Sequence, residues 1–565
     1  MRTTTWKRLL VLVLATGLLV AACGGKKADD DSSGGGSGGD GNAEAKESAG
    51  IGKGETGLTD AGEPKRGGTV TYGLDAESDG GWCLPESQLS IAGTMVRLAV
   101  YDTLTTLDSE SKPKPFLAES VEADATNETF TITLREGVTF HDGTKLTGEV
   151  VKNNLDAYLG RYPTRKPLLT PFILEDIDEV TATGPLTVEI TTKRPWPTMP
   201  MYLAGFGIMA QSQLDDEKTC DRKLVGTGPF VFDSWKRGSA VNLSRNAEYW
   251  REAPDGGKLP YLDKVVFKPI VETPTRINTF KSGDLDMVMT SLPSAISELS
   301  AFQQAGDANL LVSEDNAEVN YVLLNNAEKP FDDERVRKAF AMALDRDKIN
   351  EIINDGIPTL ADQPFYEGNI AYLDDPGFPD TDVREAKRLV KEYEADGGDA
   401  SFVMTVQNDP DVVRRSELIQ DQLKDVGISM RITPVEQAQL INLAIGGKFQ
   451  AETFRQFAST DPDTNYIWWK SGSPVNFARI DDPTIDDLLD KGRVSTDEAE
   501  RTETYQSLNE KMNANVNNIW LWYTPWAVAE QPNIHGIQNL DLPDGSKPTT
   551  GMAGGHSMAG VWIDD

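Results

Sequence analysis

Few residues of this 565-residue chain have the types and the spacing that covalent catalysis requires. The stretch GHSMAG at 555–560 comes closest, because it nearly spells the G-x-S-x-G turn that exposes a serine nucleophile. Ala559, however, stands where that turn requires glycine. The chain has no phosphate-binding lysine motif and no H-E-x-x-H, and its three histidines, at 141, 535 and 556, show no clustered spacing. We therefore expect no enzyme, no cofactor and no metal site.

Cys23 is the residue whose surroundings predict a covalent modification. A basic start precedes an apolar run, Leu9–Val20, whose length of about twelve residues falls short of the roughly 20 needed to span a bilayer. The run therefore fits a signal peptide, residues 1–22. Val20-Ala21-Ala22-Cys23 resembles a bacterial lipobox, in which the cysteine thiol takes a diacylglycerol. The alternative is an ordinary signal peptide cleaved after Ala22, with Cys23 incidental.

Residues 23–65 carry almost no large apolar side chain, so they do not offset the entropy of ordering. We expect a flexible tether with a reach of roughly 35 Å between a lipid anchor at the outer face of the membrane and a folded part. The rest of the chain is too long for one core and predicts two or three lobes. The net charge of −34 argues against nucleic acid or anionic lipid as a partner.

Cys83 and Cys220 are the two other cysteines. An even pair in an exported chain favours a disulfide, although two buried free thiols would be an alternative.

Alternating and helical patterns recur along the folded part. Residues 68–74 alternate as a strand, and Phe130, Ile132 and Leu134 lie on one face of a second strand. Thr147 is placed to cap a helix that follows it.

Farther along, residues 381–396 and 411–426 are amphipathic, and FVMTVQN and ISMRIT read as strands. This rhythm predicts an α/β protein with a parallel or mixed sheet covered by helices.

Four stretches, in order, resemble blocks of the family 5 extracytoplasmic solute-binding proteins. They are FLAESVEADATNETFTITLREGVTFHDGTKLTGEVVKNNLDAY (116–158), GTGPFVFDSWKRGSAVNLSRNAEYW (226–250), PTRINTFKSGDLDMV (274–288) and PFDDERVRKAFAMALDRDKI (330–349). Members of this family are the peptide, nickel and related receptors of ABC importers.

The resemblance implies a two-lobed, periplasmic-binding-protein-like α/β fold with an extra domain inserted in the first lobe. The expected parts are lobe I at 66–101, 223–311 and 523–565, the inserted domain at 102–222, and lobe II at 312–522. The chain would cross between the lobes near 311 and near 523. A bridge between Cys83 and Cys220 would then hold the exit of the inserted domain.

Peptide-binding relatives anchor the peptide ammonium group on an aspartate in a stretch that matches QFASTDPDTNYIWW (456–469). Asp461 and Asp463 match its later portion, whereas Ser459-Thr460 replaces the anchoring aspartate. Either acid could serve a cationic group, or both could cap the helix expected to begin near Thr464.

Aromatic residues could form walls of a cleft or part of the core. Trp520 and Trp522 alternate on a strand, which predicts a shared face, whereas adjacent Trp468 and Trp469 would diverge on a helix. The candidates for ligand contact are Trp82, Asn320, Tyr321, Trp468, Trp469, Trp520 and Trp522. Arg455 could pair with a ligand carboxylate or with a nearby acid.

We therefore expect a monomeric, lipid-anchored receptor that captures an oligopeptide-like solute by closing its lobes. An ABC permease and an ATPase, on separate chains, would be its partners. An oligosaccharide or metal-chelate receptor is the alternative within the class. A non-transport ligand sensor or adhesin on the same fold is the alternative outside it.

Overall fold

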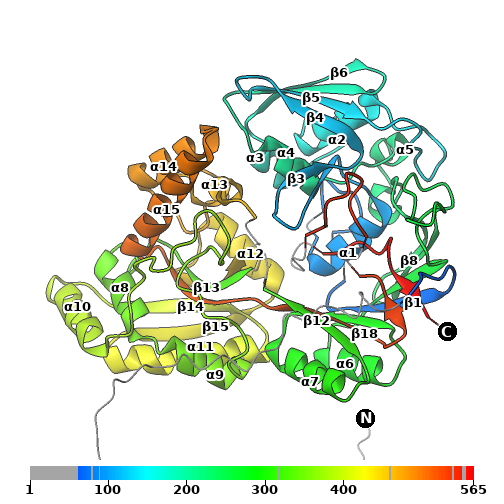
Figure 1. Cartoon of the computed structure of the whole chain (residues 1–565). Helices are drawn as coiled ribbons and strands as arrows, with labels where there is room; N and C mark the ends of the chain where they lie inside the picture. The colour runs from blue at the N-terminus through cyan, green and yellow to red at the C-terminus, as the bar shows by residue number, and fades with distance from the viewer. Residues whose placement is uncertain are drawn as a thin grey trace, which may run out of the picture. The chain divides into compact units, whose positions relative to one another are not determined.

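The computed structural model describes residues 62–77, 80–87, 89–314, 318–456, 460–537, 540–549 and 555–564. The signal peptide, Cys23 and nearly all of the tether expected from the sequence lie outside these residues. Three larger sheets, of seven, five and four strands, organise the described chain, and two short two-stranded sheets accompany them (Figure 1).

The seven-stranded sheet has the order β12-β18-β11-β1-β10-β9-β8. β1 runs parallel to β10 and β11, and β18 runs antiparallel to both β11 and β12. Helices α6 and α7 pack against this sheet. Its strands are β1 (Thr69–Leu74), β8 (Phe230–Lys236), β9 (Ala240–Arg245), β10 (Lys264–Pro269), β11 (Met287–Thr290), β12 (Asn309–Ser313) and β18 (Trp526–Glu530).

The five-stranded sheet has the order β15-β14-β16-β13-β17, in which β14 runs parallel to both β15 and β16. β13 runs antiparallel to β16 and β17. The chain enters this sheet between β12 and β13 and returns to the seven-stranded sheet between β17 and β18. Its strands are β13 (Val319–Leu324), β14 (Ser401–Gln407), β15 (Ser429–Val435), β16 (Ala451–Gln456) and β17 (Asn518–Tyr523).

The four-stranded sheet is antiparallel, with the order β4-β5-β7-β6, and α2 packs on it. Its strands are β4 (Ala118–Ala123), β5 (Thr129–Leu134), β6 (Ile177–Gly184) and β7 (Thr187–Thr192). The short sheets pair β2 (Thr105–Leu107) with β3 (Pro113–Pro115), and β19 (Ile534–His535) with β20 (Trp562–Ile563).

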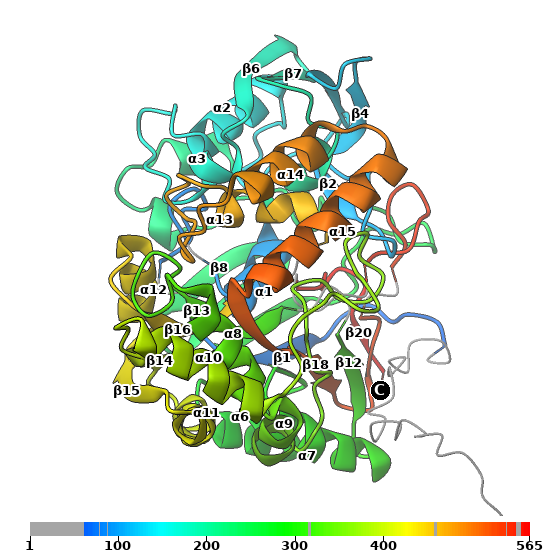
Figure 2. The ribbon, with the colours of Figure 1, turned by 90° about the vertical axis from the view of Figure 1, so that its left-hand side faces the viewer.

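Helices cover the sheets and fill the spaces beside them. α11 packs on β14 and β15, and α8, α9 and α10 pack against α11. Figure 2 shows α15 running from beside α8 toward α14. The helices from the first half of the chain are α1 (Ile91–Val100), α2 (Gly148–Tyr158), α3 (Thr170–Ile173), α4 (Met199–Tyr202), α5 (Gln211–Leu214), α6 (Thr273–Lys281) and α7 (Pro293–Gln304). The later ones are α8 (Glu334–Ala343), α9 (Arg346–Asn354), α10 (Val383–Ala395), α11 (Pro410–Val426), α12 (Gln437–Gly446), α13 (Tyr466–Trp469), α14 (Pro483–Val494) and α15 (Glu498–Asn515). Short 3-10 turns are η1 (Leu203–Gly205), η2 (Cys220–Arg222) and η3 (Pro462–Asn465).

Several helices and strands form where the local sequence patterns predict them. Phe130, Ile132 and Leu134 are fully buried on one face of β5, because alternate side chains of a strand point to the same side. The hydroxyl of Thr147 accepts a hydrogen bond from the amide of Val150 and caps α2. The two amphipathic stretches around 381–426 are α10 and α11.

The predicted disulfide is present, since Cys83 and Cys220 are bridged. The backbone amide of Trp82 donates to the carbonyl oxygen of Asp221, so the segments that carry the two cysteines are also joined by their main chains.

The expectation that Trp520 and Trp522 share a face of β17 is wrong. Trp520 lies opposite Tyr321 and Trp522 lies opposite Asn320, with a register irregularity between these two neighbours on β13. Adjacent residues of a strand point to opposite faces, and so do the residues paired with them. One extra residue in the register therefore places the two indole rings on opposite sides of the sheet.

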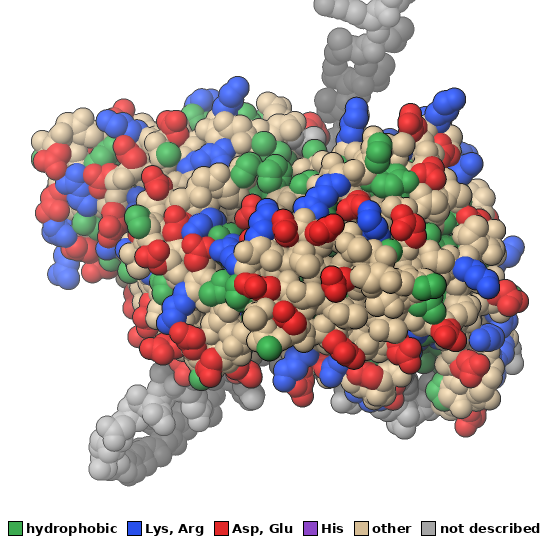
Figure 3. Space-filling model, turned by 90° about the horizontal axis from the view of Figure 1, so that it is seen from above, with side chains coloured by type: hydrophobic (Ala, Val, Ile, Leu, Met, Phe, Trp, Pro, Cys, Tyr) green, Lys and Arg blue, Asp and Glu red, His purple; other side chains and the backbone are tan. Residues whose placement is uncertain are grey.

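On the face seen in Figure 3, acidic and basic side chains are interspersed, so the net charge of −34 is not gathered there into one patch. Among the described residues, no helix is long and apolar enough to cross a membrane. The same residues contain no group of three or more histidine, cysteine, aspartate or glutamate side chains placed to hold a metal ion.

Candidate functional site

The two larger sheets turn the carboxyl ends of several strands toward each other. β1, β11 and β12 run in one direction and end at the edge from which the chain leaves for β13. β14, β15, β16 and β17 run in one direction and end at the edge from which the chain returns to β18. In open α/β sheets, ligands bind beyond the carboxyl ends of the strands. Polar side chains along these two edges are therefore the candidates for contact with a ligand.

Arg455 joins the two edges. It stands near the end of β16, and its Nη1 lies 3.4 Å from Ser291 Oγ, just beyond the end of β11. The same Nη1 lies 3.4 Å from Glu318 Oε2, a buried carboxylate at the start of β13. Both contacts are long for a charge-assisted hydrogen bond, which is normally about 2.8 Å. The side chain of Arg455 is 45% exposed, so a solute can reach it.

Residues of the segment by which the chain returns from β17 to β18 hold Glu318 in place. It accepts a hydrogen bond of 3.3 Å from Trp526 Nε1, and its backbone carbonyl accepts one of 2.7 Å from the amide of Thr524. The hydroxyl of Thr524 accepts a 2.6 Å hydrogen bond from Asn320 Nδ2. Asn320, one of the predicted contact residues, therefore supports the crossover in this structure.

Arg415 lies near the start of α11, which follows β14, and is 7% exposed. Its guanidinium lies 5.2 Å from the ring centre of Trp522, in a cation–π contact. Within the described part of the chain, its Nε has no hydrogen-bond partner. Burial, and then the positive charge of Arg455, lower the pKa of Arg415 to about 10. The group is thus still charged at neutral pH.

Asp75 adds a carboxylate at the other edge, directly after β1. Burial raises its pKa, while the nearby Arg276 and Arg455 act in the opposite direction. Arg276 is itself held by backbone carbonyl oxygens, those of Ile270 at 2.6 Å and Met289 at 3.3 Å. The edge of the seven-stranded sheet thus offers a negative group within the electrostatic range of Arg455.

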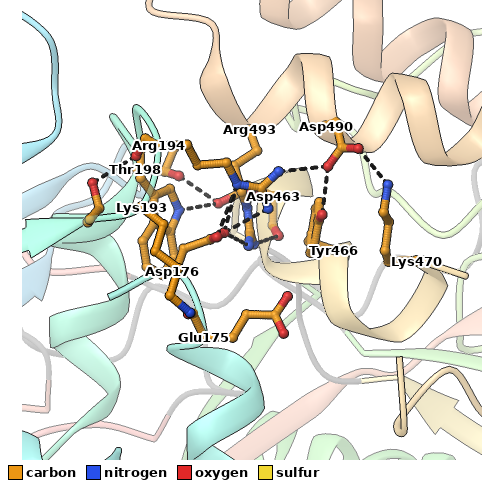
Figure 4. Close-up of polar contacts among 12 residues, drawn as sticks. Glu175, Asp176, Lys193, Arg194, Thr198, Asp463, Tyr466, Lys470, Asp490 and Arg493 are labelled. Carbon is orange, nitrogen blue, oxygen red and sulfur yellow. Dashed lines mark hydrogen bonds and ion pairs between the residues drawn. The ribbon is translucent and has the colours of Figure 1, made fainter. Parts of the chain in front are cut away.

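Asp463 is completely buried, and its carboxylate is surrounded by donors (Figure 4). Oδ2 accepts from Trp196 Nε1 at 2.8 Å, Thr198 Oγ1 at 2.7 Å and Tyr202 OH at 3.0 Å. Oδ1 accepts from Arg493 Nε at 2.7 Å. A carboxylate has about four acceptor positions, so these contacts occupy its capacity. The pKa of Asp463 is lowered, because Arg493 and the hydrogen bonds outweigh the effect of burial.

Arg493 continues this network into the segment before β6. Its Nη1 donates to Asp176 Oδ2 at 2.8 Å, and its guanidinium lies 3.8 Å from the ring centre of Tyr466. Arg194 belongs to the same region of the chain as Asp176. It donates hydrogen bonds to Asp176 and to Asp490 of α14 (Figure 4). Charged side chains therefore join the region of the four-stranded sheet to α13 and α14.

Asp461 caps a helical turn, which was the alternative to ligand binding that the sequence analysis left open. Its Oδ1 accepts from the amide of Asp463, at the start of η3, and from Arg501 Nη2 at 2.7 Å.

The predicted aromatic residues are distributed over several places. Trp469 packs edge-to-face on Phe365, and Trp520 is buried with its Nε1 donating to Asn513. Trp468 is partly buried against Phe477, and Tyr321 lies between Phe454 and Trp520. Trp522 differs from the other four in that the guanidinium of Arg415 lies over its ring. The five predicted aromatic residues in this half of the chain are Tyr321, Trp468, Trp469, Trp520 and Trp522.

Trp82 stands apart from the others, in the seven-stranded half. It packs edge-to-face on Trp235 and lines a small recess together with Leu74, Glu77 and Phe267. Its indole Nε1 is buried without a hydrogen-bond partner among the described residues.

Sequence reasoning missed Arg415, Asp75 and Glu318. No motif marks them, and their common feature is their place beside strand ends that meet only in the folded chain. The rule that sites form at carboxyl ends of strands could have selected Asp75 after its predicted strand.

Comparison with known proteins identifies the class. The model of the bacterial extracellular solute-binding proteins, family 5, matches residues 112–477, which is more than half of the chain. The chain therefore belongs to this family, and it is a non-enzymatic receptor of ABC transport rather than an enzyme.

Among its relatives, a glutathione-binding protein of Escherichia coli K12 is 27% identical over 434 residues, which cover 73% of this chain and 81% of the relative. Two solved structures share the fold. One is the binding protein AgaA of A. tumefaciens R10 in complex with agropinic acid, with a TM-score of 0.76, 24% identity, and coverage of 88% of this chain and 99% of the other. The other is the oligopeptide-binding protein AppA of Bacillus subtilis with a nonapeptide, with a TM-score of 0.75, 22% identity, and coverage of 89% and 100%. The predicted periplasmic-binding-protein fold is thus confirmed.

Proposed function

We propose that this protein captures a peptide-like solute outside the cytoplasm and delivers it to an ABC permease driven by a separate ATPase. The observation that carries the proposal is the meeting of two strand edges at Arg455, with Arg415 and Asp75 beside it. A peptide carries a carboxylate and an ammonium group, and these edges carry cations and an anion.

The names of the relatives support a peptide-like solute but leave alternatives. Glutathione and a nonapeptide are peptides, whereas agropinic acid is named in the complex of AgaA. An oligosaccharide or metal-chelate ligand remains the alternative within the class. A sensor or adhesin remains the alternative outside transport.

We further propose that the parts of the chain act as lobes. Lobe I would be 66–101, 223–311 and 523–565, lobe II would be 312–522, and 102–222 would form an inserted domain. Closure of the lobes around the solute would produce the state that the permease recognises, since ligand contacts in both lobes favour the shut conformation. The contacts of Asp463 with Trp196 and of Arg493 with Asp176 would then be bonds between lobe II and the inserted domain.

The membrane attachment completes the proposal. Residues 1–22 would be removed, Cys23 would carry the lipid, and residues 24–65 would act as the tether of a monomer. More than one acyl chain on Cys23 would make the attachment stable.

The test uses the compact unit Ser48–Asp565. Separate pools of tripeptides, oligosaccharides and metal chelates are added, and the melting temperature is measured for each. We expect the peptide pool alone to raise it, because a ligand that binds only the folded state stabilises that state. A rise with sugars or chelates alone would replace the peptide with that class. A rise with none would favour the sensor or adhesin.

A further inference from the structure

Charged side chains of alternating sign form one continuous series across the boundary between the proposed inserted domain and lobe II (Figure 4). Arg194 Nη1 donates to Asp490 Oδ1 at 2.7 Å, and Arg493 Nη1 donates to Asp176 Oδ2 at 2.8 Å. Within the described residues, these two contacts are the ion pairs that join the two parts. The series runs in the order Lys470, Asp490, Arg194, Asp176, Arg493 and Asp463.

Each acid of this series also has a basic partner on its own side of the boundary. The pairs within one part are Arg194 with Asp176 at 2.8 Å, Arg493 with Asp463 at 2.7 Å, and Lys470 with Asp490 at 2.5 Å. Removing one partner of a buried ion pair is costly, because the other charge is left alone. Separation of the two parts leaves every charge of the series with a partner, so that cost does not arise.

Neutral donors add contacts that the two parts make only while they touch. Trp196 Nε1, Thr198 Oγ1 and Tyr202 OH, all of the inserted domain, donate to the carboxylate of Asp463. After separation, water would replace these donors, and Asp463 would keep its bond from Arg493. The polar contacts of this boundary are therefore suited to forming and breaking.

The apolar part of the boundary is incompletely buried. Leu169, Phe172 and Ile173 of the inserted domain pack on the core of lobe II, and each remains partly exposed. Polar interfaces of this kind are typical of domains that move relative to each other. The backbone permits such motion, because the chain passes from the inserted domain to lobe II by way of the seven-stranded sheet.

We infer that this series is a latch that closes lobe II against the inserted domain before a solute arrives. Each contact joins two groups of this chain, so the latch needs no solute in order to form. A closed form that is already populated raises the apparent affinity for the solute, because less of the binding energy is used for closing. Arg194 and Asp176 are thus positioning residues that act through closure. The inference rests on the proposed function for what the closed form captures, whereas its test requires no solute.

The experiment measures a distance across the boundary in the Ser48–Asp565 unit. Spin labels are attached at Glu149→Cys on α2 and Glu510→Cys on α15, which are both exposed positions. Other thiols do not interfere, because Cys83 and Cys220 are bridged and the third cysteine precedes Ser48. The protein is refolded from denaturant to remove any solute, and pulsed electron paramagnetic resonance gives the distribution of distances.

The latch variant is the double substitution Arg194→Gln/Asp176→Asn, which removes both ion pairs across the boundary and leaves the net charge unchanged. We expect the population at the longer distance to grow at least about threefold relative to the population at the shorter one, since hydrogen bonds to charged groups contribute to closing. The matched control is Arg335→Gln/Asp333→Asn, which removes a pair that lies wholly within lobe II. Its distribution should equal that of the unchanged protein.

Two results would overturn the latch. One is the same distribution in the unchanged protein and the latch variant, which would show that these contacts do not hold the closed form. The other is an equal shift in the control. Either result leaves the peptide function standing, and a latch that opens as expected stands even if no peptide binds.

A milder substitution covers the case in which the latch variant folds poorly. If its melting temperature falls by more than about 5 °C, Thr198→Val takes its place, since it removes one donor to Asp463 and keeps all the charges. The same increase of the longer distance is expected. A lower melting temperature with an unchanged distribution would show that these side chains only hold the fold.

Discussion

Arg493 Nε donates to Asp463 Oδ1 at 2.7 Å, and both side chains are almost completely withdrawn from solvent. The pair sits where α14 and η3 meet Trp196, Thr198 and Asp176 from a distant part of the sequence. Through these contacts, the pair links the region of α14 and η3 to a part of the chain that lies more than 250 residues earlier.

Breaking the pair should destabilise the protein strongly. Asp463→Ala leaves Arg493 buried with fewer partners, and we expect the free energy of unfolding to fall by about 3–5 kcal/mol. Urea denaturation of the Ser48–Asp565 unit measures the change.

Arg388→Ala is the control for that measurement, because it removes a solvent-exposed pair with Glu385 on α10. Its effect should be far smaller. Equal effects of the two substitutions would contradict the importance assigned to the Asp463–Arg493 pair.

Glu452 should make stability depend on pH. This side chain of β16 is fully buried without a hydrogen-bond partner among the described residues, and burial raises its pKa to about 8. Between about pH 5 and 8 the folded protein therefore keeps a proton that the unfolded chain has released. Stability must fall as pH rises through this window, by at most about 1.4 kcal/mol per pH unit.

The variant Glu452→Gln tests this sign. It does not titrate, so its free energy of unfolding should fall less steeply from pH 5 to pH 8 than that of the unchanged protein. Some slope will remain, because burial also raises the pKa of Glu530 to about 8. Identical slopes from denaturation at pH 5, 6, 7 and 8 would show that Glu452 does not titrate in this range.

The disulfide should matter for stability because it closes a long loop. Cys83 and Cys220 are 137 residues apart, and a bridge over a loop of that size restricts the unfolded chain by an amount worth up to about 5 kcal/mol. We expect the double variant Cys83→Ala/Cys220→Ala to melt at a lower temperature. Reducing agent should lower the melting temperature of the unchanged protein but not that of the double variant. If reduction lowers both equally, the bridge is not the cause.

Lipid attachment at Cys23 is tested in a bacterial host. Palmitate labelling should mark the unchanged protein and not Cys23→Ser, and the variant should leave the membrane fraction. Labelling of both forms would contradict attachment at Cys23.

Patterns within short stretches predicted much of the fold. The alternation of Phe130, Ile132 and Leu134 predicted β5, and Thr147 predicted the start of α2. Both predictions succeeded because alternation and capping depend only on neighbouring residues. The ordered blocks identified the family even though each block alone is modestly specific.

Features that depend on distant residues escaped prediction. Trp520 and Trp522 were expected on one face, but the register irregularity opposite Asn320 and Tyr321 separates them, and alternation in one strand carries no sign of it. Asp463 looked like a ligand anchor or a cap, whereas its partners Trp196 and Tyr202 lie more than 250 residues earlier. Arg415 carried no signal at all, since its burial and its place over Trp522 are properties of the folded chain.

The central claim is that this receptor holds a peptide-like solute, and native mass spectrometry of the gently purified Ser48–Asp565 unit tests it most directly. The account predicts extra mass that remains bound under mild ionisation, is lost on denaturation, and shows a ladder of amino-acid mass spacings. Hexose spacings, or the mass of a metal chelate, would contradict it and assign the protein to another ligand class. If no mass remains and added peptides also fail to bind, the peptide account is wrong.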